Sequence, residues 1–206
     1  MKVFLIRHGE SILNGRGIHQ YPDTPLSNAG IRQAEAIAER LVGVKIDLIL
    51  ASRYKRAMQT AQIISRRIDR RIVYTKLLNE FKNPSDVEGK KHRSALSVKI
   101  SKEQAKHKDD PKWHYSDEEN MFDKIARGKR AVRYIEGRGA DSVVVATHSG
   151  LLRMILAVGL FGKEIRQEDF AKIVSFMRTE NTGITECDVT EGRWRLITFN
   201  DFVHLK

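Results

Sequence analysis

Apolar residues occur along this chain in two kinds of pattern that alternate with each other. Short apolar runs, typical of buried strands, cover residues 3–6, 46–50, 72–74 and 142–147. Between them, apolar side chains recur every three or four positions, as in amphipathic helices, over residues 31–41, 57–68 and 118–136. This alternation predicts an α/β fold: a three-layer α/β/α sandwich around a mostly parallel central sheet.

The last third of the chain predicts one further helix and a closing hairpin. An apolar run between Leu151 and Val158 follows the strand at 142–147 and indicates a helix buried on most of its circumference. Residues 184–189 and 194–199 both have strand composition and flank Glu191-Gly192, which is typical of a hairpin turn. We therefore expect two adjacent strands near the end.

Between Glu80 and Glu119 the apolar periodicity is lost, and Lys, Ser, Asp and His replace the residues that would define core elements. We interpret this segment as a helical and loop insertion over the active site. A chain of 206 residues suffices for one substantial domain with such an insertion. The prediction is a single domain over 1–206 with an insertion at about 80–119.

Composition indicates a soluble globular protein, with 41% hydrophobic and 31% charged residues. The first apolar run ends at Arg7, which is too short for a secretory signal or a membrane span. The single cysteine, Cys187, cannot form an internal disulfide. We expect a cytoplasmic protein without a membrane partner.

The formal net charge of +11 indicates an anionic partner, which can be nucleic acid, an anionic membrane or a phosphorylated small molecule. Much of the excess lies between Arg66 and Lys108, where carboxylates are few. A scattered, solvated cationic face is the simpler interpretation, so nucleic acid is not the expected partner. The sequence gives no signal of oligomeric state and is compatible with a homo-oligomer.

Two histidines follow predicted strands directly, at the sheet edge where α/β proteins bind ligands. His8 comes after Arg7 and before Gly9, and His148 lies between the strand at 142–147 and the next helix. Arginine offers planar donors to phosphate oxygens, imidazole offers a nucleophilic nitrogen, and glycine allows close backbone approach. The alternative for such a tripeptide is an ordinary strand end.

Arg56 lies in the first turn of the helix predicted at 57–68, where the positive end of the helix dipole disfavours a cation. An anionic ligand would explain this placement, although a solvated basic turn is the alternative. Metal chemistry is not expected, because the remaining histidines show no ligand pairs at helical or finger spacing. Those histidines are His19, His92, His107, His114 and His204.

Taken together, the motifs resemble the histidine phosphatase superfamily, also called the phosphoglycerate-mutase-like family, over nearly the whole chain. The matching positions fall in several separate blocks of the sequence. They are Leu5 to Ser11 with Asn14, Asp23 to Ser27 with Gly30, Gln33-Ala34, Ser52, Arg56-Ala57, Gln59 to Ala61, Glu80, Thr147 to Gly150, Asn181 to Thr185, and His204-Leu205.

The resemblance implies that His8 attacks phosphorus and becomes phosphohistidine, while Arg7, Arg56 and His148 hold the phosphoryl oxygens. It implies that Glu80 protonates the leaving oxygen and then activates water, and it implies no cofactor. The substrate contacts that it suggests come from the loop after His8 and from the helix after His148. They are Asn14, Ser11, Arg16, Gln20 and Ser149, the last through its backbone N–H.

Hydrolysis is the predicted outcome, so the expected enzyme is a metal-independent phosphoric monoester hydrolase. Phosphoglycerate mutases of this family characteristically add a tyrosine shortly after the acid and an arginine pair in the insertion. Here Asn83 stands three residues after Glu80, and no adjacent arginines occur between Gly89 and Glu119. Two alternatives stay open: mutase-type phosphoryl transfer, and a catalytically idle relative that binds nucleic acid.

Overall fold

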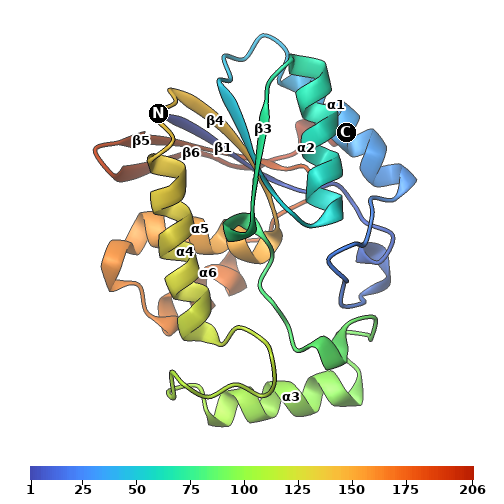
Figure 1. The fold of residues 1–206 in the computed structure, drawn as a ribbon, viewed down its shortest axis with the longest axis vertical. Helices are drawn as coiled ribbons and strands as arrows, with labels where there is room; N and C mark the ends of the chain where they lie inside the picture. Colours follow the sequence, from blue (N-terminus) through green and yellow to red (C-terminus); the bar gives the residue numbers. More distant parts are fainter.

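The computed structural model describes residues 1–206 apart from Gly15, and in this part the chain forms six strands in one sheet and six α-helices (Figure 1). The strands are β1 (Lys2–Arg7), β2 (Leu48–Ser52), β3 (Ile72–Thr75), β4 (Ser142–Thr147), β5 (Ile184–Thr190) and β6 (Arg193–Asp201). The helices are α1 (Asn28–Arg40), α2 (Lys55–Ile68), α3 (Ala95–Lys106), α4 (Met121–Glu136), α5 (Ser149–Phe161) and α6 (Gln167–Phe176).

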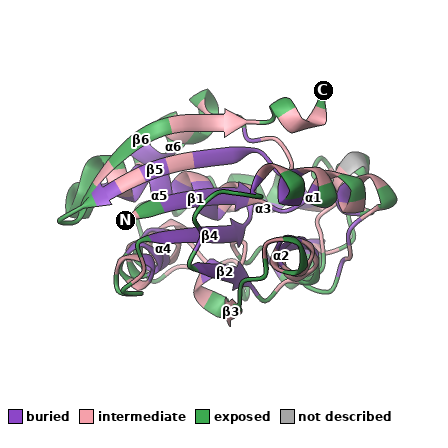
Figure 2. Ribbon diagram, turned by 90° about the horizontal axis from the view of Figure 1, so that it is seen from above, coloured by how far each residue is buried: buried purple, intermediate pink, exposed green. Residues whose placement is uncertain are grey.

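The strand order is β3-β2-β4-β1-β5-β6, which Figure 2 shows as a continuous series. The first four of these strands pair in parallel, whereas β5 and β6 are antiparallel to β1 and to each other. A mostly parallel sheet is therefore confirmed. The closing hairpin is confirmed as well, with its turn at Glu191 and Gly192, both at positive φ.

Two separate cores lie on the two faces of the sheet because successive side chains of a strand point to opposite faces. On β1, Val3 and Leu5 belong to the core under α4, α5 and α6, whereas Phe4 and Ile6 belong to the core under α1 and α2. Strands β2 and β4 divide their side chains in the same way. The three-layer arrangement is thus confirmed.

Some boundaries differ from the sequence prediction. Strand β2 begins at Leu48 and continues to Ser52, two residues later than expected at each end, although Ile46 is still buried. Helix α1 ends at Arg40, one residue before the end of the predicted range, and Leu41 caps it. Burial alone therefore did not mark the ends of these elements.

Helices α3 and α6 were not predicted as separate elements, because neither carries a continuous apolar stripe. Helix α3 buries only Ser97 and Ile100, and α6 buries only Asp169 and Phe170. Helix α3 lies within the 80–119 segment and sits at the bottom of Figure 1, away from α1 and α2 along the long axis.

A tight backbone crossing fixes the loop after β1 against the start of α1. A side-chain Cβ on Gly30 would collide with the Glu10 carbonyl, and one on Gly9 would collide with the Gly30 carbonyl. The Ser27 N–H also donates to the Glu10 carbonyl at 2.9 Å. This crossing ties α1 to the chain immediately after His8.

We expect Gly30→Ala to lower the free energy of unfolding by about 1–3 kcal/mol, because the added methyl group must displace backbone. Chemical denaturation followed by circular dichroism measures the change. Asn28→Ala, at an exposed position two residues earlier, is the control and should change stability by less than about 0.5 kcal/mol. Equal effects in the two variants would contradict the collision.

Candidate active site

The parallel pairing of β1 with β4 brings the two strand-end histidines together. Arg7 is in register with Thr147, and the His8 N–H donates to the Thr147 carbonyl at 2.9 Å. The imidazole rings of His8 and His148 lie with centroids 5.0 Å apart. Residues 140 positions apart therefore share one edge of the sheet, as the sequence predicted.

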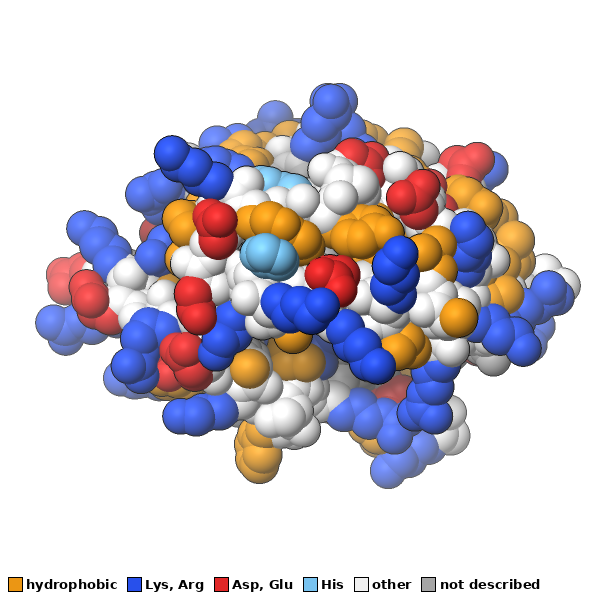
Figure 3. Space-filling model, turned by 90° about the horizontal axis from the view of Figure 1, so that it is seen from below, with side chains coloured by type: hydrophobic (Ala, Val, Ile, Leu, Met, Phe, Trp, Pro, Cys, Tyr) orange, Lys and Arg blue, Asp and Glu red, His pale blue; other side chains and the backbone are white. Residues whose placement is uncertain are grey.

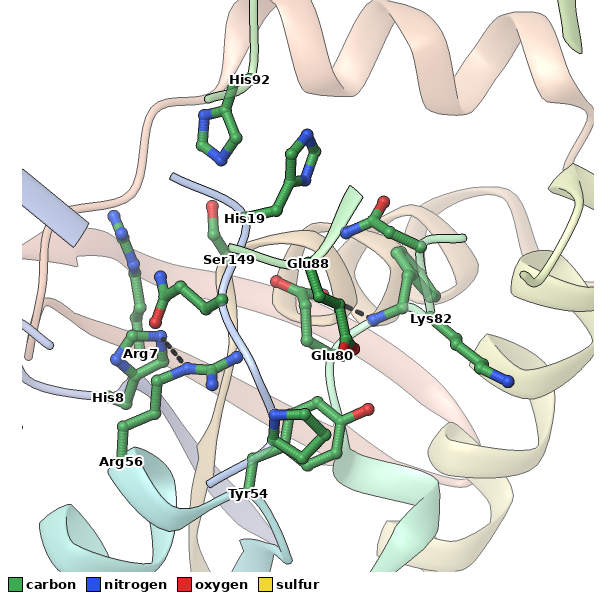
Figure 4. A pocket seen from close by; sticks show the side chains of 14 residues that line it. Arg7, His8, His19, Tyr54, Arg56, Glu80, Lys82, Glu88, His92 and Ser149 are labelled. Carbon is green, nitrogen blue, oxygen red and sulfur yellow. Dashed lines mark hydrogen bonds between the residues drawn. The ribbon is translucent and has the colours of Figure 1, made fainter. Parts of the chain in front are cut away.

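The hydrogen bonds of His8 indicate its tautomer. Its Nδ1 lies 2.7 Å from the Gly9 carbonyl oxygen, which only accepts, so Nδ1 carries the proton. Its Nε2 accepts from the Arg56 Nε–H at 3.2 Å. The nitrogen with a free electron pair is thus Nε2, and it faces a guanidinium group (Figure 4).

Two guanidinium groups lie beside this imidazole. Arg7 donates through Nη1 to the Thr179 carbonyl at 2.6 Å and through Nη2 to Asn14 Oδ1 at 3.3 Å. Arg56, which is buried, donates through Nη1 to the Tyr21 carbonyl at 3.0 Å. Burial lowers the pKa of Arg56 to about 10 and also lowers the pKa of Arg7, yet both stay protonated near neutrality.

His148 is fully buried below this group and is held by the end of β2. Its Nε2 lies 2.8 Å from Ser52 Oγ, and the Ser52 hydroxyl in turn donates to Asn79 Oδ1 at 3.0 Å. Since that hydroxyl accepts from His148, Nε2 carries the proton of the neutral ring. Within the described part of the chain, His148 Nδ1 and Arg7 Nε are buried without a hydrogen-bond partner.

Both histidines are held in the neutral form. Burial is the main cause that lowers the pKa of His8 well below its usual value, and the positive charges of Arg56 and Arg7 lower it further. The pKa of His148 is lowered by burial first and by Arg56 second. For both histidines, desolvation is therefore a larger cause than the arginine charges.

Glu80 lies at the N-terminus of α5, beside the helix start that follows His148. Its carboxylate accepts backbone N–H groups from Phe81 at 3.0 Å, Gly150 at 3.0 Å and Leu151 at 3.1 Å. The positive end of the helix dipole favours an acceptor at this place. The carboxylate therefore has a fixed position in the wall of the same cavity.

The remaining predicted contacts divide into two groups. Gln20 and Ser149 line the cavity, and Ser149 Oγ lies 2.8 Å from Thr179 Oγ1, so its hydroxyl is already engaged. Asn14 and Ser11 do not line it but support it: Asn14 accepts from Arg7, and Ser11 Oγ donates to Gln20 Oε1 at 2.6 Å. Arg16 is exposed and outside the cavity wall.

The cavity itself has a volume of about 190 Å³. Several of its wall residues were not predicted, because most lie in the 80–119 segment, where the sequence has no decodable pattern. Figure 4 shows the wall residues around Arg7, His8 and Arg56. The unpredicted ones are His19, Pro22, Tyr54, Phe81, Lys82, Asn83, Glu88 and His92.

A turn from the far end of the chain holds the backbone of Arg7 and His8. The Thr182 N–H donates to the Arg7 carbonyl at 2.9 Å, and Asn181 Nδ2 donates to the His8 carbonyl at 2.7 Å. Thr182 has a φ of 57°, which is strained for a β-branched residue. Its hydroxyl lies 3.0 Å from His204 Nε2, so the C-terminal turn braces it.

Among the described residues, no group of three or more His, Cys, Asp or Glu side chains lies close enough to hold a metal ion. None of the helices there has the length and apolar character needed to cross a membrane.

The sequence pattern of the histidine phosphatase superfamily (branch 1) matches residues 3–202. The chain belongs to this superfamily, as the motifs had indicated, and its α/β fold matches solved members.

Two relatives and one solved structure that match most of this chain are named as phosphatases. A probable phosphatase of Schizosaccharomyces pombe is 34% identical, with 100% of this chain and 96% of the relative covered. The adenosylcobalamin/alpha-ribazole phosphatase of Escherichia coli is 30% identical over 76% of this chain and 78% of its own length. The structure of a mycobacterial glucosyl-3-phosphoglycerate phosphatase, in complex with VO3, superposes with a TM-score of 0.77 at 25% identity, covering 97% and 99% of the two chains. These relatives support a phosphatase.

The histidine pKa directions give a spectroscopic prediction. We expect the His8 and His148 rings to stay neutral through pH 6.5, whereas His114, whose pKa is raised by its hydrogen bond to Asp123, should titrate above that pH. Nitrogen-edited NMR of the imidazole rings measures all three. A His8 midpoint at or above pH 6.5 would contradict the burial argument.

The same pKa directions predict how stability depends on pH. Because His8 and His148 bind protons at higher pH in the unfolded chain than in the folded one, the free energy of unfolding should fall as pH drops below about 6.5.

Proposed function

We propose that this chain is a metal-independent phosphatase that hydrolyses phosphomonoesters through a phosphohistidine on His8. The observation that carries the proposal is the convergence of His8 and two arginines on one cavity, with the buried His148 ring directly behind His8. Phosphoryl transfer depends mainly on positioning and on stabilising the charge of the phosphoryl oxygens. This arrangement supplies a nucleophile and fixed positive charge without a metal ion.

In the first half-reaction, the Nε2 electron pair of His8 forms a bond to phosphorus while the bond from phosphorus to the ester oxygen breaks. A protonated Glu80 gives its proton to the departing oxygen. Water then attacks the phosphohistidine, Glu80 takes a proton from that water, and the P–N bond breaks. Inorganic phosphate leaves, and His8 returns with its proton on Nδ1.

Arg56 has two partners in succession during this cycle. At rest its Nε–H donates to His8 Nε2, but that electron pair is used once the P–N bond forms. The same N–H is then free to donate to a phosphoryl oxygen, as is the unpartnered Nε of Arg7. A bound dianion also favours protonation of His148 at Nδ1, where the neutral ring has no proton.

Hydrolysis is favoured over mutase chemistry by the wall of the cavity. In the described residues, Arg7 and Arg56 are the arginines of that wall, and Figure 4 shows both beside His8. The position three residues after Glu80 is Asn83, which lines the cavity without an aromatic hydroxyl. No guanidinium pair is left over to hold a substrate carboxylate, so water is the expected acceptor.

An idle, nucleic-acid-binding protein fits the surface less well. Figure 3, which views the molecule from below, has Lys and Arg side chains over the whole face with Asp and Glu interspersed. This face lacks the continuous cationic stripe that tracks a phosphate backbone. The partner we propose is therefore a phosphorylated small molecule.

We also propose that residues 1–206 act as one domain in the cytoplasm. The lone Cys187 is buried, and burial raises the pKa of its thiol to about 12, so it is inert toward oxidation and compatible with a reducing setting. A homo-oligomer remains compatible with this proposal.

The proposal is tested with His8→Ala in a phosphatase assay over phosphorylated metabolites, with a chelator present. We expect kcat to fall at least about 10³-fold and the wild-type rate to be unaffected by the chelator. Arg56→Gln should lower kcat by ~10²–10³ because one fixed donor is lost. Arg53→Gln, at an exposed position outside the cavity, is the matched control and should keep the full rate.

Glu80→Gln separates the two halves of the reaction. We expect a loss of ~10²–10⁴ in turnover, with phosphoenzyme accumulating for substrates whose leaving group needs no proton, such as p-nitrophenyl phosphate. Intact-protein mass spectrometry after rapid quenching detects one added phosphoryl group. An unphosphorylated Glu80→Gln protein with wild-type turnover would assign the acid to another residue.

A further inference from the structure

A roof formed by two distant segments, residues 17–21 and 88–92, closes one side of the cavity. The two segments pair like antiparallel strands: His19 N–H donates to the Lys90 carbonyl, Gly89 N–H to the His19 carbonyl, and His92 N–H to the Gly17 carbonyl, each at 2.9 Å. The Tyr21 hydroxyl donates to the Glu88 carbonyl at 3.3 Å. The 80–119 segment is thereby fastened to the loop after His8.

This roof places polar side chains opposite the phosphoryl position. His19 and His92 lie edge to face with ring centroids 4.5 Å apart, on the far side of the cavity from Arg56 in Figure 4. Burial and the neighbouring His92 lower the pKa of His19, so its ring is neutral near pH 7. The His19 imidazole therefore offers hydrogen bonds and no fixed positive charge to a leaving group.

The two charged side chains of the outer wall, Lys82 and Glu88, differ in whether they have an ion-pair partner. The Lys82 ammonium pairs with Asp117 at 2.8 Å and points away from His8 in Figure 4. The Glu88 carboxylate lines the cavity, is half-buried, and has no hydrogen-bond or ion-pair partner within the described part of the chain. Burial and the negative charge of Asp117 raise its pKa. The positive charge of Lys82 lowers the pKa of Glu88 in part, so the outer wall carries an acidic group that is without a direct partner among the described residues.

The volume under the roof limits the size of the leaving group. A cavity of about 190 Å³ is roughly six times the ~30 Å³ share of one water molecule. The phosphoryl group takes part of this space. The cavity volume is also below the ~300–1,000 Å³ of pockets that bury drug-sized ligands. A leaving group of a few carbon atoms fits inside, whereas a nucleoside extends beyond this volume.

We propose that this roof and Glu88 select phosphomonoesters with a small leaving group that carries hydroxyl or ammonium groups, and disfavour those with a second anionic group. The unpaired Glu88 carboxylate accepts hydrogen bonds from a hydroxyl or ammonium group and repels a carboxylate or second phosphate. His19 adds a neutral hydrogen-bonding group in the same roof. This selection rests on the proposed phosphatase activity and names the substrate class of that site.

The test compares two substrates of the same skeleton, glycerol 3-phosphate and 3-phosphoglycerate. The first has a hydroxymethyl group where the second has a carboxylate. We expect kcat/KM to be about tenfold higher for glycerol 3-phosphate, and phosphoethanolamine to be preferred over 3-phosphoglycerate as well. Adenosine 5′-monophosphate should be hydrolysed at least about tenfold less well than glycerol 3-phosphate. Glu88→Gln should bring the first two substrates to near parity by raising the rate with 3-phosphoglycerate.

Asp86→Asn is the matched control, because Asp86 lies in the same loop with an exposed side chain outside the cavity wall. It removes one negative charge two residues away and should keep the tenfold preference. A wild-type preference for 3-phosphoglycerate, or the same preference in Glu88→Gln as in the wild type, would overturn the inference and leave the phosphatase proposal intact. Hydrolysis of none of these compounds would overturn the proposed activity and this inference with it.

Discussion

The parallel pairing of β1 with β4 is the constraint on which the rest of the structure depends. With Arg7 opposite Thr147, the residues that follow both strands, His8 and His148, emerge side by side at the same edge. Parallel strands deliver their carboxyl ends to one side of a sheet, so chemistry separated along the chain meets in space. Every other group of the site is placed relative to this pair.

The site maintains two neutral imidazoles beside two buried cations, which is an unfavourable arrangement without an anion. Desolvation and the guanidinium charges act in the same direction on the pKa values of His8 and His148. The carbonyls of Thr179 and Tyr21 partly compensate Arg7 and Arg56, while Arg7 Nε and His148 Nδ1 remain without partners in the described residues. In the proposed reaction, a phosphoryl dianion supplies the partners that these groups lack.

Rigidity around His8 comes from three distant parts of the chain. The Gly9–Gly30 crossing fixes the loop after β1, and the turn at Asn181 and Thr182 holds the carbonyls of Arg7 and His8. A residue held at positive φ persists only where its surroundings determine its conformation, and Thr182 has contacts to β1 and to the C-terminal turn. These backbone contacts and the burial of its own ring together orient His8.

The sequence by itself determined the strands, most of the sheet-covering helices, the hairpin and the residues at the strand ends, because apolar periodicity and local motifs are properties of neighbouring residues. It predicted His8, Arg7, Arg56, Glu80 and His148; the structure places the first four in the wall of one cavity and the buried His148 ring beside His8. Helices α3 and α6 escaped prediction because they bury few apolar side chains.

Only the tertiary structure decided the outer wall. Glu88, His92 and His19 reach the cavity because two loops about 70 residues apart pair through backbone hydrogen bonds, which carry no side-chain signature in the sequence. Tertiary contacts likewise determined that burial, more than the arginines, keeps His8 neutral, because desolvation depends on everything packed around the ring.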